Sequence, residues 1–306
     1  MGNKIFNLFF AVLAFLFSSV ASIGAEVAKP TVFVSILPQK YFVQQICMDL
    51  VNIEVMAPPG ASPATYEPKP SQMAALSGAK AYFSIGVPFE RTWLDKFAAA
   101  NPNMKVVRTD KNIEKMPMDV FHTHEMHEHA REDEKDNGIH EDGDIIMDPH
   151  IWLSPPLVLK QSQTILEALA EIDPENAETF KTNHGKFVSQ IQNLHEELKE
   201  IFTGKQGLQF MVFHPSWGYF ARAYGLVQVP AEIEGKEPKP AQLQELIEKA
   251  RALDIKVVFA QPQFSTRSAE LIAREIGGRV ILVDPLALDW AKNLREVATA
   301  VRSALK

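Results

Sequence analysis

The residues best suited to chemistry lie in one stretch, residues 121–155, which reads FHTHEMHEHAREDEKDNGIHEDGDIIMDPHIWLSP. This stretch holds six of the nine histidines of the protein: His122, His124, His127, His129, His140 and His150. Eleven acidic residues and only two basic residues accompany them between positions 119 and 148. Neutral imidazole and carboxylate both bind borderline divalent metals, and so polar a segment cannot build a core of its own. We therefore predict a metal-attracting loop over about residues 111–144, followed by an ordered apolar motif around His150.

Three polar residues stand where strands of a parallel sheet are expected to end. His214 directly follows the apolar run LQFMVF, Asp284 directly follows VILV, and His150 follows an apolar Ile-Ile pair. In open parallel sheets, ligands bind outside the carboxyl ends of the strands. Two imidazoles and one carboxylate that converge there would make a first shell for a divalent transition metal. Each also has a simpler interpretation, because a single histidine often bonds a backbone carbonyl and an Asp-Pro pair often starts a turn.

The elements that must position these residues alternate between strand and helix patterns. Strands are expected at Thr31–Ile36, Val51–Met56, Ala81–Ile85, Lys105–Arg108, Leu208–Phe213, Lys256–Ala260 and Val280–Val283. Helical patterns separate these runs, which favours βαβ units and parallel sheets. A chain of this length usually forms two domains. We therefore predict an α/β protein.

One predicted helix is much longer than the others. After the start signal Asp173-Pro174, apolar residues recur at intervals of three, four or seven: Phe180, Phe187, Ile191, Leu194, Leu198 and Ile201. This stripe predicts one continuous helix within residues 173–204. At about 1.5 Å per residue it would be roughly 40 Å long, enough to cross a two-lobed protein. His184 and His195 lie off the stripe, and we expect both to be exposed to solvent.

The N-terminus has the pattern of a secretory signal. Lys4 is the only charged residue before Glu26, and an apolar run, Ile5–Phe17, precedes small residues. An apolar core of about a dozen residues is short for a membrane span. We therefore expect a cleaved signal peptide over residues 1–25, with a retained anchor as the alternative. The single cysteine, Cys47, does not stand at the cleavage site, so lipid attachment there is not supported, and no intramolecular disulfide can form.

The charge balance excludes one class of partner. The chain carries 31 basic and 38 acidic residues, a formal net charge of −7. An acidic exported protein is a poor partner for nucleic acid. It is a suitable partner for cations.

Several motifs occur in an order that resembles a known family. They are GASPATYEPKPSQ, the histidine-rich acidic loop, DPHIWLSP, FHPSWGYFARAYGL, EPKPAQLQELI and VDPLA. From about Thr31 to the C-terminus, the chain resembles the periplasmic metal-binding proteins of zinc and manganese ABC importers, most of all the zinc-specific ZnuA-like branch. The resemblance implies two lobes, each a mostly parallel sheet flanked by helices, joined by one long rigid helix with the metal in the cleft between them. The implied division is residues 26–172, the helix at 173–204, and residues 205–306.

The resemblance also implies roles for individual residues. Three residues match ligand positions of the family: His150 of DPHIW, His214 of FHPSWGYF and Asp284 of VDPLA. The histidine at position 214 resembles the zinc members, whereas manganese members tend to carry glutamate at this position. The loop is typical of zinc members too, which implies auxiliary metal binding at His122, His124, His127, His129 and His140. The implied function is capture of Zn²⁺, with Mn²⁺ less favoured, in the periplasm and delivery to a membrane permease. We expect a monomer that has no small organic substrate and is not an enzyme.

One position departs from the family pattern. The first family ligand is the histidine of a motif like SPHTYEP, but this chain reads SPATYEP and carries Ala64 there. A methyl group cannot bind a metal. A water molecule or a loop histidine would complete the shell, or the site is weak or altered in specificity; Glu67 is a further possible substitute. Three protein ligands and one water form an accepted shell for Zn²⁺.

The incomplete ligand set leaves alternatives to a high-affinity receptor. A secreted zinc hydrolase would use the open position for water, but the loop reads HEMHEH and lacks the HExxH pair of many zinc hydrolases. A metal buffer or chaperone would bind several ions weakly through the loop, with a degenerate cleft site. Ala64 keeps this second alternative open, and a manganese-type receptor is a third.

Overall fold

The computed structural model describes residues 28–119, 146–232 and 236–305. Its strands are β1 (Thr31–Val34), β2 (Asn52–Val55), β3 (Ala81–Ser84), β4 (Lys105–Arg108), β5 (Gln209–Val212), β6 (Val227–Pro230), β7 (Val257–Ala260) and β8 (Arg279–Leu282). Its α-helices are α1 (Leu37–Cys47), α2 (Pro70–Leu76), α3 (Pro88–Ala100), α4 (Pro155–Ile172), α5 (Ala177–Ile201), α6 (Gly218–Ala223), α7 (Pro240–Ala252), α8 (Arg267–Glu275) and α9 (Trp290–Ala304). Two short 3-10 turns, η2 (Ile151–Leu153) and η3 (Pro174–Asn176), precede α4 and α5.

The strands form two four-stranded parallel sheets with the same topology. Their orders are β2-β1-β3-β4 and β6-β5-β7-β8. In the first sheet, β1 pairs with β2 on one side and with β3 on the other; in the second sheet, β5 pairs in the same way with β6 and β7. The chain connections on the two sides of the β1–β3 pair, and of the β5–β7 pair, therefore run in opposite directions along the sheet. Such a switch point is where parallel α/β sheets bind ligands. The predicted α/β class with two mostly parallel sheets is confirmed. Strand β6 was not predicted, because VQVP is short and ends in proline.

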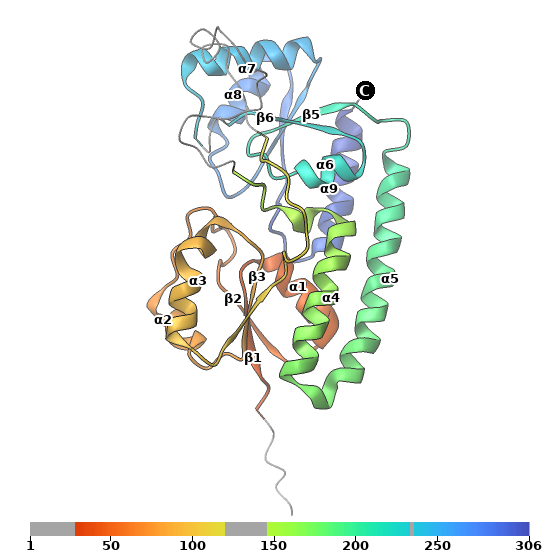
Figure 1. Cartoon of the computed structure of the whole chain (residues 1–306). Coiled ribbons are helices and arrows are strands. Elements are labelled where there is room, and N and C mark those ends of the chain that lie inside the picture. The colour runs from red at the N-terminus through yellow and green to blue at the C-terminus, as the bar shows by residue number, and fades with distance from the viewer. Residues whose placement is uncertain (1–27, 120–145, 233–235, 306) are drawn as a thin grey trace, which may run out of the picture.

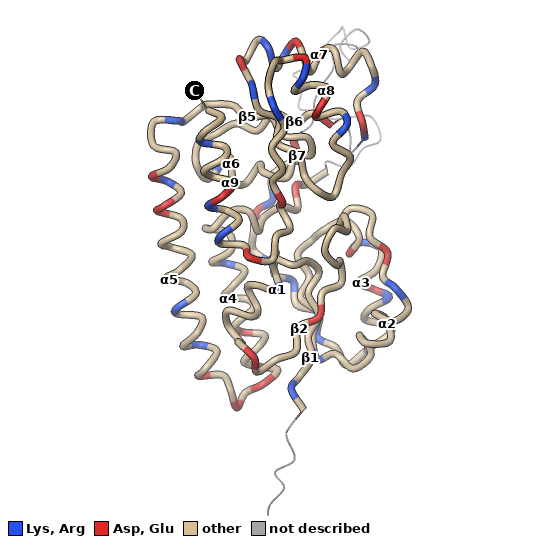
Figure 2. The backbone as a smooth tube through the Cα atoms, turned by 180° about the vertical axis from the view of Figure 1, so that it is seen from behind, with Lys and Arg blue, Asp and Glu red and all other residues tan. Residues whose placement is uncertain are grey.

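The predicted long helix is present as α5, preceded by the turn η3. Figure 1 shows α5 running beside α4 along the first sheet and reaching the level of the second. Its apolar stripe is buried against α1, α4 and α9. In Figure 2, acidic and basic residues both occur along α5, as expected for the solvent side of an amphipathic helix. The prediction of one helix that joins two lobes is therefore confirmed.

The two lobes share a single main core. One cluster of buried side chains runs from Val32 of β1 to Val212 of β5 and on to Val301 of α9, while a smaller second cluster lies around α7 and α8. The indole of Trp290, at the start of α9, stands edge-on to Phe42 of α1 with ring centroids 5.2 Å apart. Interiors packed in this way resist deformation. The shared core therefore restricts movement of one lobe against the other.

The exposure predicted for two histidines of α5 is not what the structure has. His184 is buried at 9 % exposure, and its Nε2 lies 3.0 Å from the hydroxyl oxygen of Ser162 on α4. His195 is half-buried, with Nδ1 3.3 Å from the hydroxyl of Tyr224. The prediction of exposure was wrong for His184 because α4 covers a face of α5 beyond its apolar stripe.

The predicted signal peptide, residues 1–25, lies outside the described residues, as does most of the histidine-rich loop. The exact lobe boundaries stay predictions. None of the helices in the described ranges combines the length and apolar character needed to cross a membrane.

Candidate metal centre

A pocket of about 240 Å³ lies where the carboxyl ends of the two sheets face each other. In the first lobe its wall includes Ala64, which follows β2, and Val87, which follows β3. In the second lobe it includes His214 after β5, Glu232 after β6 and Gln263 after β7. Its position at the strand ends of both sheets is the position expected for a ligand site.

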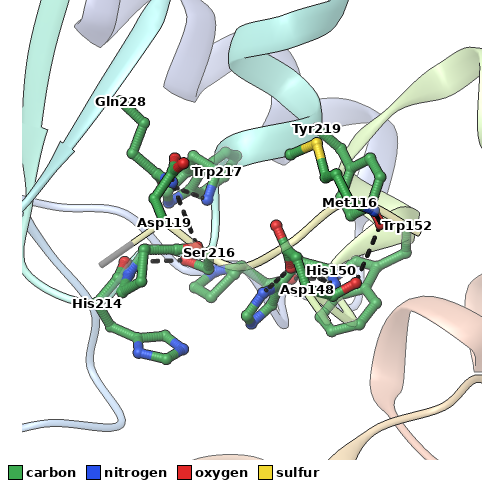
Figure 3. Close-up of polar contacts among 12 residues, drawn as sticks. Met116, Asp119, Asp148, His150, Trp152, His214, Ser216, Trp217, Tyr219 and Gln228 are labelled. Carbon is green, nitrogen blue, oxygen red and sulfur yellow. Dashed lines mark hydrogen bonds and ion pairs between the residues drawn. The ribbon is translucent and has the colours of Figure 1, made fainter. Parts of the chain in front are cut away.

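The two histidines predicted as ligands meet in this pocket. His150 and His214 both line it, with ring centroids 5.3 Å apart and ring planes at 72°. Figure 3 shows the two rings next to each other, His150 beside Asp148 and His214 on a separate segment. Residues 64 positions apart in sequence are thus brought to one point by the facing sheet ends.

His150 is held by a buried carboxylate. Its Nδ1 lies 2.7 Å from Oδ1 of Asp148, which also accepts from the backbone N–H of His150 at 2.8 Å, and Asp148 is 1 % exposed. Burial lowers the pKa of His150, and the charge of Asp148 opposes that shift. Because a carboxylate only accepts, the proton of the neutral imidazole sits on Nδ1 and the lone pair on Nε2. Nε2 is therefore the nitrogen available to a metal.

His214 is held in the same way from the other lobe. Its Nδ1 lies 2.8 Å from Oε1 of Glu232, which is 4 % exposed. Gln261 fixes the backbone on both sides, accepting from the N–H of His214 at 3.2 Å and donating to its carbonyl at 2.7 Å. The ring of Phe264 lies 4.8 Å from the imidazole, centroid to centroid. This pairing also leaves Nε2 for a metal, as carboxylate–histidine pairs do at metal sites.

The segment that carries Asp148 is anchored to the second lobe. Met118 donates its backbone N–H to the carbonyl of Ile146, and Asp148 donates to that of Met116, each at 2.8 Å. The hydroxyl of Tyr219 on α6 accepts from the backbone of Met116 at 3.0 Å and donates to the carbonyl of Asp148 at 3.1 Å (Figure 3). These bonds hold Asp148, and through it His150, in register with α6.

A side chain on Gly218, the first residue of α6, would crowd the segment that supports His150. A Cβ on Gly218 would lie 2.7 Å from the terminal methyl of Met116 and 3.0 Å from Oδ2 of Asp148. The Met116 methyl ends a flexible side chain and can move, but the contact with Asp148 is tighter than nine in ten real Cβ contacts. Glycine therefore allows α6 to approach the segment that supports His150.

Asp284 is not brought to the same pocket as the two histidines. Its Oδ1 accepts from Nε2 of Gln263 at 2.8 Å and from the backbone N–H of Leu286 at 2.9 Å. Asp284 lines a neighbouring pocket of about 350 Å³. Gln263 and Leu286 line both this pocket and the one that holds the histidines. Within the described ranges, no three side chains of His, Cys, Asp or Glu stand as a group that could hold a metal ion. Asp284 as a third ligand stays a prediction that requires its carboxylate to turn toward the histidines.

The remaining predicted positions divide between the pocket wall, the surface and the undescribed segment. Ala64, the position to which the family resemblance assigns the first ligand, lines the pocket. Glu67 is exposed and does not line it. His122, His124, His127, His129 and His140 lie outside the described residues.

Sequence reasoning missed three polar residues of this site. Asp148 was visible, since it stands two positions before His150 in DPH, but it was counted only among the acidic residues of the loop. Glu232 follows the unpredicted strand β6, 18 positions after His214, and no local pattern links them. Gln263 has no signal of its own beyond its place after a predicted strand.

Comparisons with known proteins agree with this architecture. The family model described as zinc-uptake complex component A, periplasmic, matches residues 32–304. The high-affinity zinc uptake system protein ZnuA of Bacillus subtilis (strain 168) is 28 % identical over 275 residues, which cover 88 % of this chain and 82 % of that protein. A crystal structure of ZnuA is 43 % identical with a TM-score of 0.79, covering 90 % of this chain and 99 % of that one. The crystal structure of a ZnuA deletion mutant with zinc bound is also 43 % identical in sequence, with a TM-score of 0.78. That match covers 90 % of this chain and 98 % of the mutant chain. This chain therefore belongs to the ZnuA family of periplasmic zinc-uptake components.

Proposed function

We propose that the protein is a periplasmic receptor that binds one Zn²⁺ between its lobes and delivers it to the permease of an ABC importer. One observation carries the proposal: His150 and His214 share a pocket, and each is bonded through Nδ1 to a buried carboxylate. Both Nε2 atoms are thereby left as donors. Two imidazole donors favour zinc over harder cations that prefer oxygen.

The proposed ligand set combines these two nitrogens with a carboxylate oxygen of Asp284. Both hydrogen bonds described for this carboxylate use Oδ1, so Oδ2 is the oxygen that would bind. Asp148 and Glu232 keep the imidazoles oriented and place negative charge behind them, which stabilises a bound dication. Because the shared core and α5 restrict lobe movement, small rotations of side chains such as Asp284 would account for capture and release.

A receptor is favoured over an enzyme or a buffer. The similar proteins are named as uptake components rather than as enzymes. The carboxylates nearest the histidines, Asp148 and Glu232, are already bonded to the imidazoles, and a hydrolase would need one of them as a base. The paired imidazoles provide one organised site, which a buffer with a degenerate cleft would not need.

Export and partner choice complete the proposal. Residues 1–25 would act as a cleaved signal peptide, and the receptor would act as a monomer whose partner is the permease. The single cysteine, Cys47, is buried in α1 and unsuited to lipid attachment.

Calorimetric titration of the mature protein with Zn²⁺ and Mn²⁺ tests this function. We expect one tight zinc ion per chain and a weaker response to manganese. His150→Ala or His214→Ala should lower the zinc affinity by roughly 100-fold or more, because each removes a direct ligand. His195→Ala, which removes a half-buried imidazole on α5, is the matched control and should leave the affinity unchanged.

Deletion of residues 121–143 separates the receptor from the buffer. A receptor keeps its one tight ion, because His150 and His214 remain. Loss of all tight binding with that segment would favour the buffer and contradict the proposal.

A further inference from the structure

We propose that the side-chain carbonyl of Gln263 is a metal ligand, an oxygen donor that no family motif assigned in this chain. The inference rests on the proposed function and names one further donor of the same site. Gln263 is the polar one of two residues that line both pockets: it lines one with His150 and His214 and the other with Asp284. It follows β7, next to the strand that His214 follows, at the switch point of the second sheet.

The orientation of the amide group is set by its partner. Nε2 of Gln263 donates to Oδ1 of Asp284 at 2.8 Å. A carboxylate only accepts hydrogen bonds, so the nitrogen must face Asp284 and the oxygen must face away. The next residue, Phe264, packs against the ring of His214 and fixes the segment beside that ligand.

The amide oxygen is buried without a hydrogen-bond donor. Oε1 of Gln263 is one of three buried side-chain atoms in the described residues that have no hydrogen-bond partner. Native proteins keep few such groups, and a bound ion is one of the reasons for which they do. An amide carbonyl is a neutral oxygen donor to divalent cations, and a carbonyl that binds a cation needs no N–H partner.

Two features of the surroundings favour a cation at this oxygen. Ala64 lines the same pocket and supplies no donor, so the protein ligands would otherwise number only three. The hydrogen bond from Nε2 to Asp284 polarises the amide and places more negative charge on Oε1. Two imidazole nitrogens, one carboxylate oxygen and one amide oxygen would then form a four-coordinate shell.

The test compares metal binding by three variants of the full mature chain. Gln263→Met removes the carbonyl and keeps the side-chain length. Gln263→Glu keeps an oxygen donor but removes the N–H that Asp284 accepts. Gln161→Met is the matched control, because Oε1 of Gln161 is also buried and without a partner but lies on α4, outside the pocket lining. Zinc affinity is measured by calorimetry, and the visible absorption of bound Co²⁺ reports the donor set.

We expect Gln263→Met to lower the zinc affinity roughly 10- to 100-fold and to change the cobalt spectrum. Gln263→Glu should bind zinc within about threefold of the wild-type affinity, since a carboxylate oxygen replaces the amide oxygen. Gln161→Met should change neither measurement. An unchanged cobalt spectrum in Gln263→Met, or a Gln263→Glu variant as weak as Gln263→Met, would overturn the assignment and leave Gln263 only a positioning role on Asp284. A wild-type protein without a tight ion would overturn the proposed function as well.

Discussion

The indole N–H of Trp152 donates to the carbonyl oxygen of Pro285 at 2.7 Å, and this bond ties together two segments that carry predicted ligands. Trp152 follows His150 by two residues, and Pro285 directly follows Asp284. The carbonyl of Trp152 in turn accepts from the indole of Trp290 at 2.7 Å, and both indoles are buried. The spacing between these segments is therefore fixed by the core rather than by the pocket.

Trp152→Phe keeps the aromatic ring and removes this donor. The buried carbonyl of Pro285 loses its partner, so the free energy of unfolding should fall by about 1–3 kcal/mol. Zinc affinity should fall as well, because Asp284 is less well placed. Urea unfolding and calorimetry on the same preparation check both effects. Trp93→Phe, at a half-buried site on α3, is the control; equal losses in the two variants would show that the Trp152 bond has no special role.

The carboxylates behind the histidines should act through imidazole orientation. Asp148→Asn and Glu232→Gln keep side-chain size but place an amide against Nδ1, so we expect each to lower zinc affinity roughly 10- to 100-fold. The exposed Asp49→Asn serves as control for the loss of one negative charge. Calorimetry is the measurement. Should Asp49→Asn weaken binding as much as the other two, the effect would be one of net charge and not of positioning.

Ala64→His restores an imidazole at the first ligand position of the family. We expect tighter zinc binding, and a larger gain in the background of Gln263→Met than in the wild type, because the added imidazole and the amide oxygen compete for one coordination position. Calorimetry on the four proteins of this cycle measures the coupling. Equal affinity of wild type and Ala64→His would show that the position opposite Ala64 is not open to a ligand.

Much of this arrangement follows from local sequence pattern, and the rest depends on packing. The stripe from Phe180 to Ile201 predicts α5 because a 25-residue helix must keep one apolar face buried. The same stripe does not predict which polar positions a neighbour covers, and so the burial of His184 was missed. His150 and His214 were found because they follow apolar runs. Glu232 was not, because its pairing with His214 exists only once β5 and β6 lie side by side.

A buried acid gives the fold a pH dependence that is independent of metal. Glu90, at 3 % exposure, accepts from the backbone N–H groups of Ile85 at 2.9 Å and Gly86 at 2.7 Å. Burial raises the pKa of Glu90 from 4.5 to about 7, although these bonds oppose the shift. The folded state thus holds the proton more tightly than the unfolded state. Protonation of Glu90 therefore stabilises the folded state. This contribution to the free energy of unfolding is complete below pH 4.5 and is lost as the pH rises through 7, an effect of roughly 3 kcal/mol at most.

Glu90→Gln cannot ionise and should remove this dependence. From pH 5 to pH 8, we expect the wild type to lose free energy of unfolding relative to the variant. Urea unfolding of the metal-free proteins measures this difference. Glu178→Gln, at an exposed position on α5, should follow the wild-type curve. Parallel curves for wild type and Glu90→Gln would contradict the assignment of the raised pKa to Glu90.

A crystal structure of the mature protein loaded with one equivalent of Zn²⁺ tests the central claim most directly. We predict a single zinc ion within about 2.0–2.1 Å of Nε2 of both His150 and His214. The carboxylate of Asp284 should have turned to place an oxygen about 2.0–2.2 Å from the ion. A zinc ion bound away from this pocket, or one that contacts only one of the two imidazoles, would contradict the account.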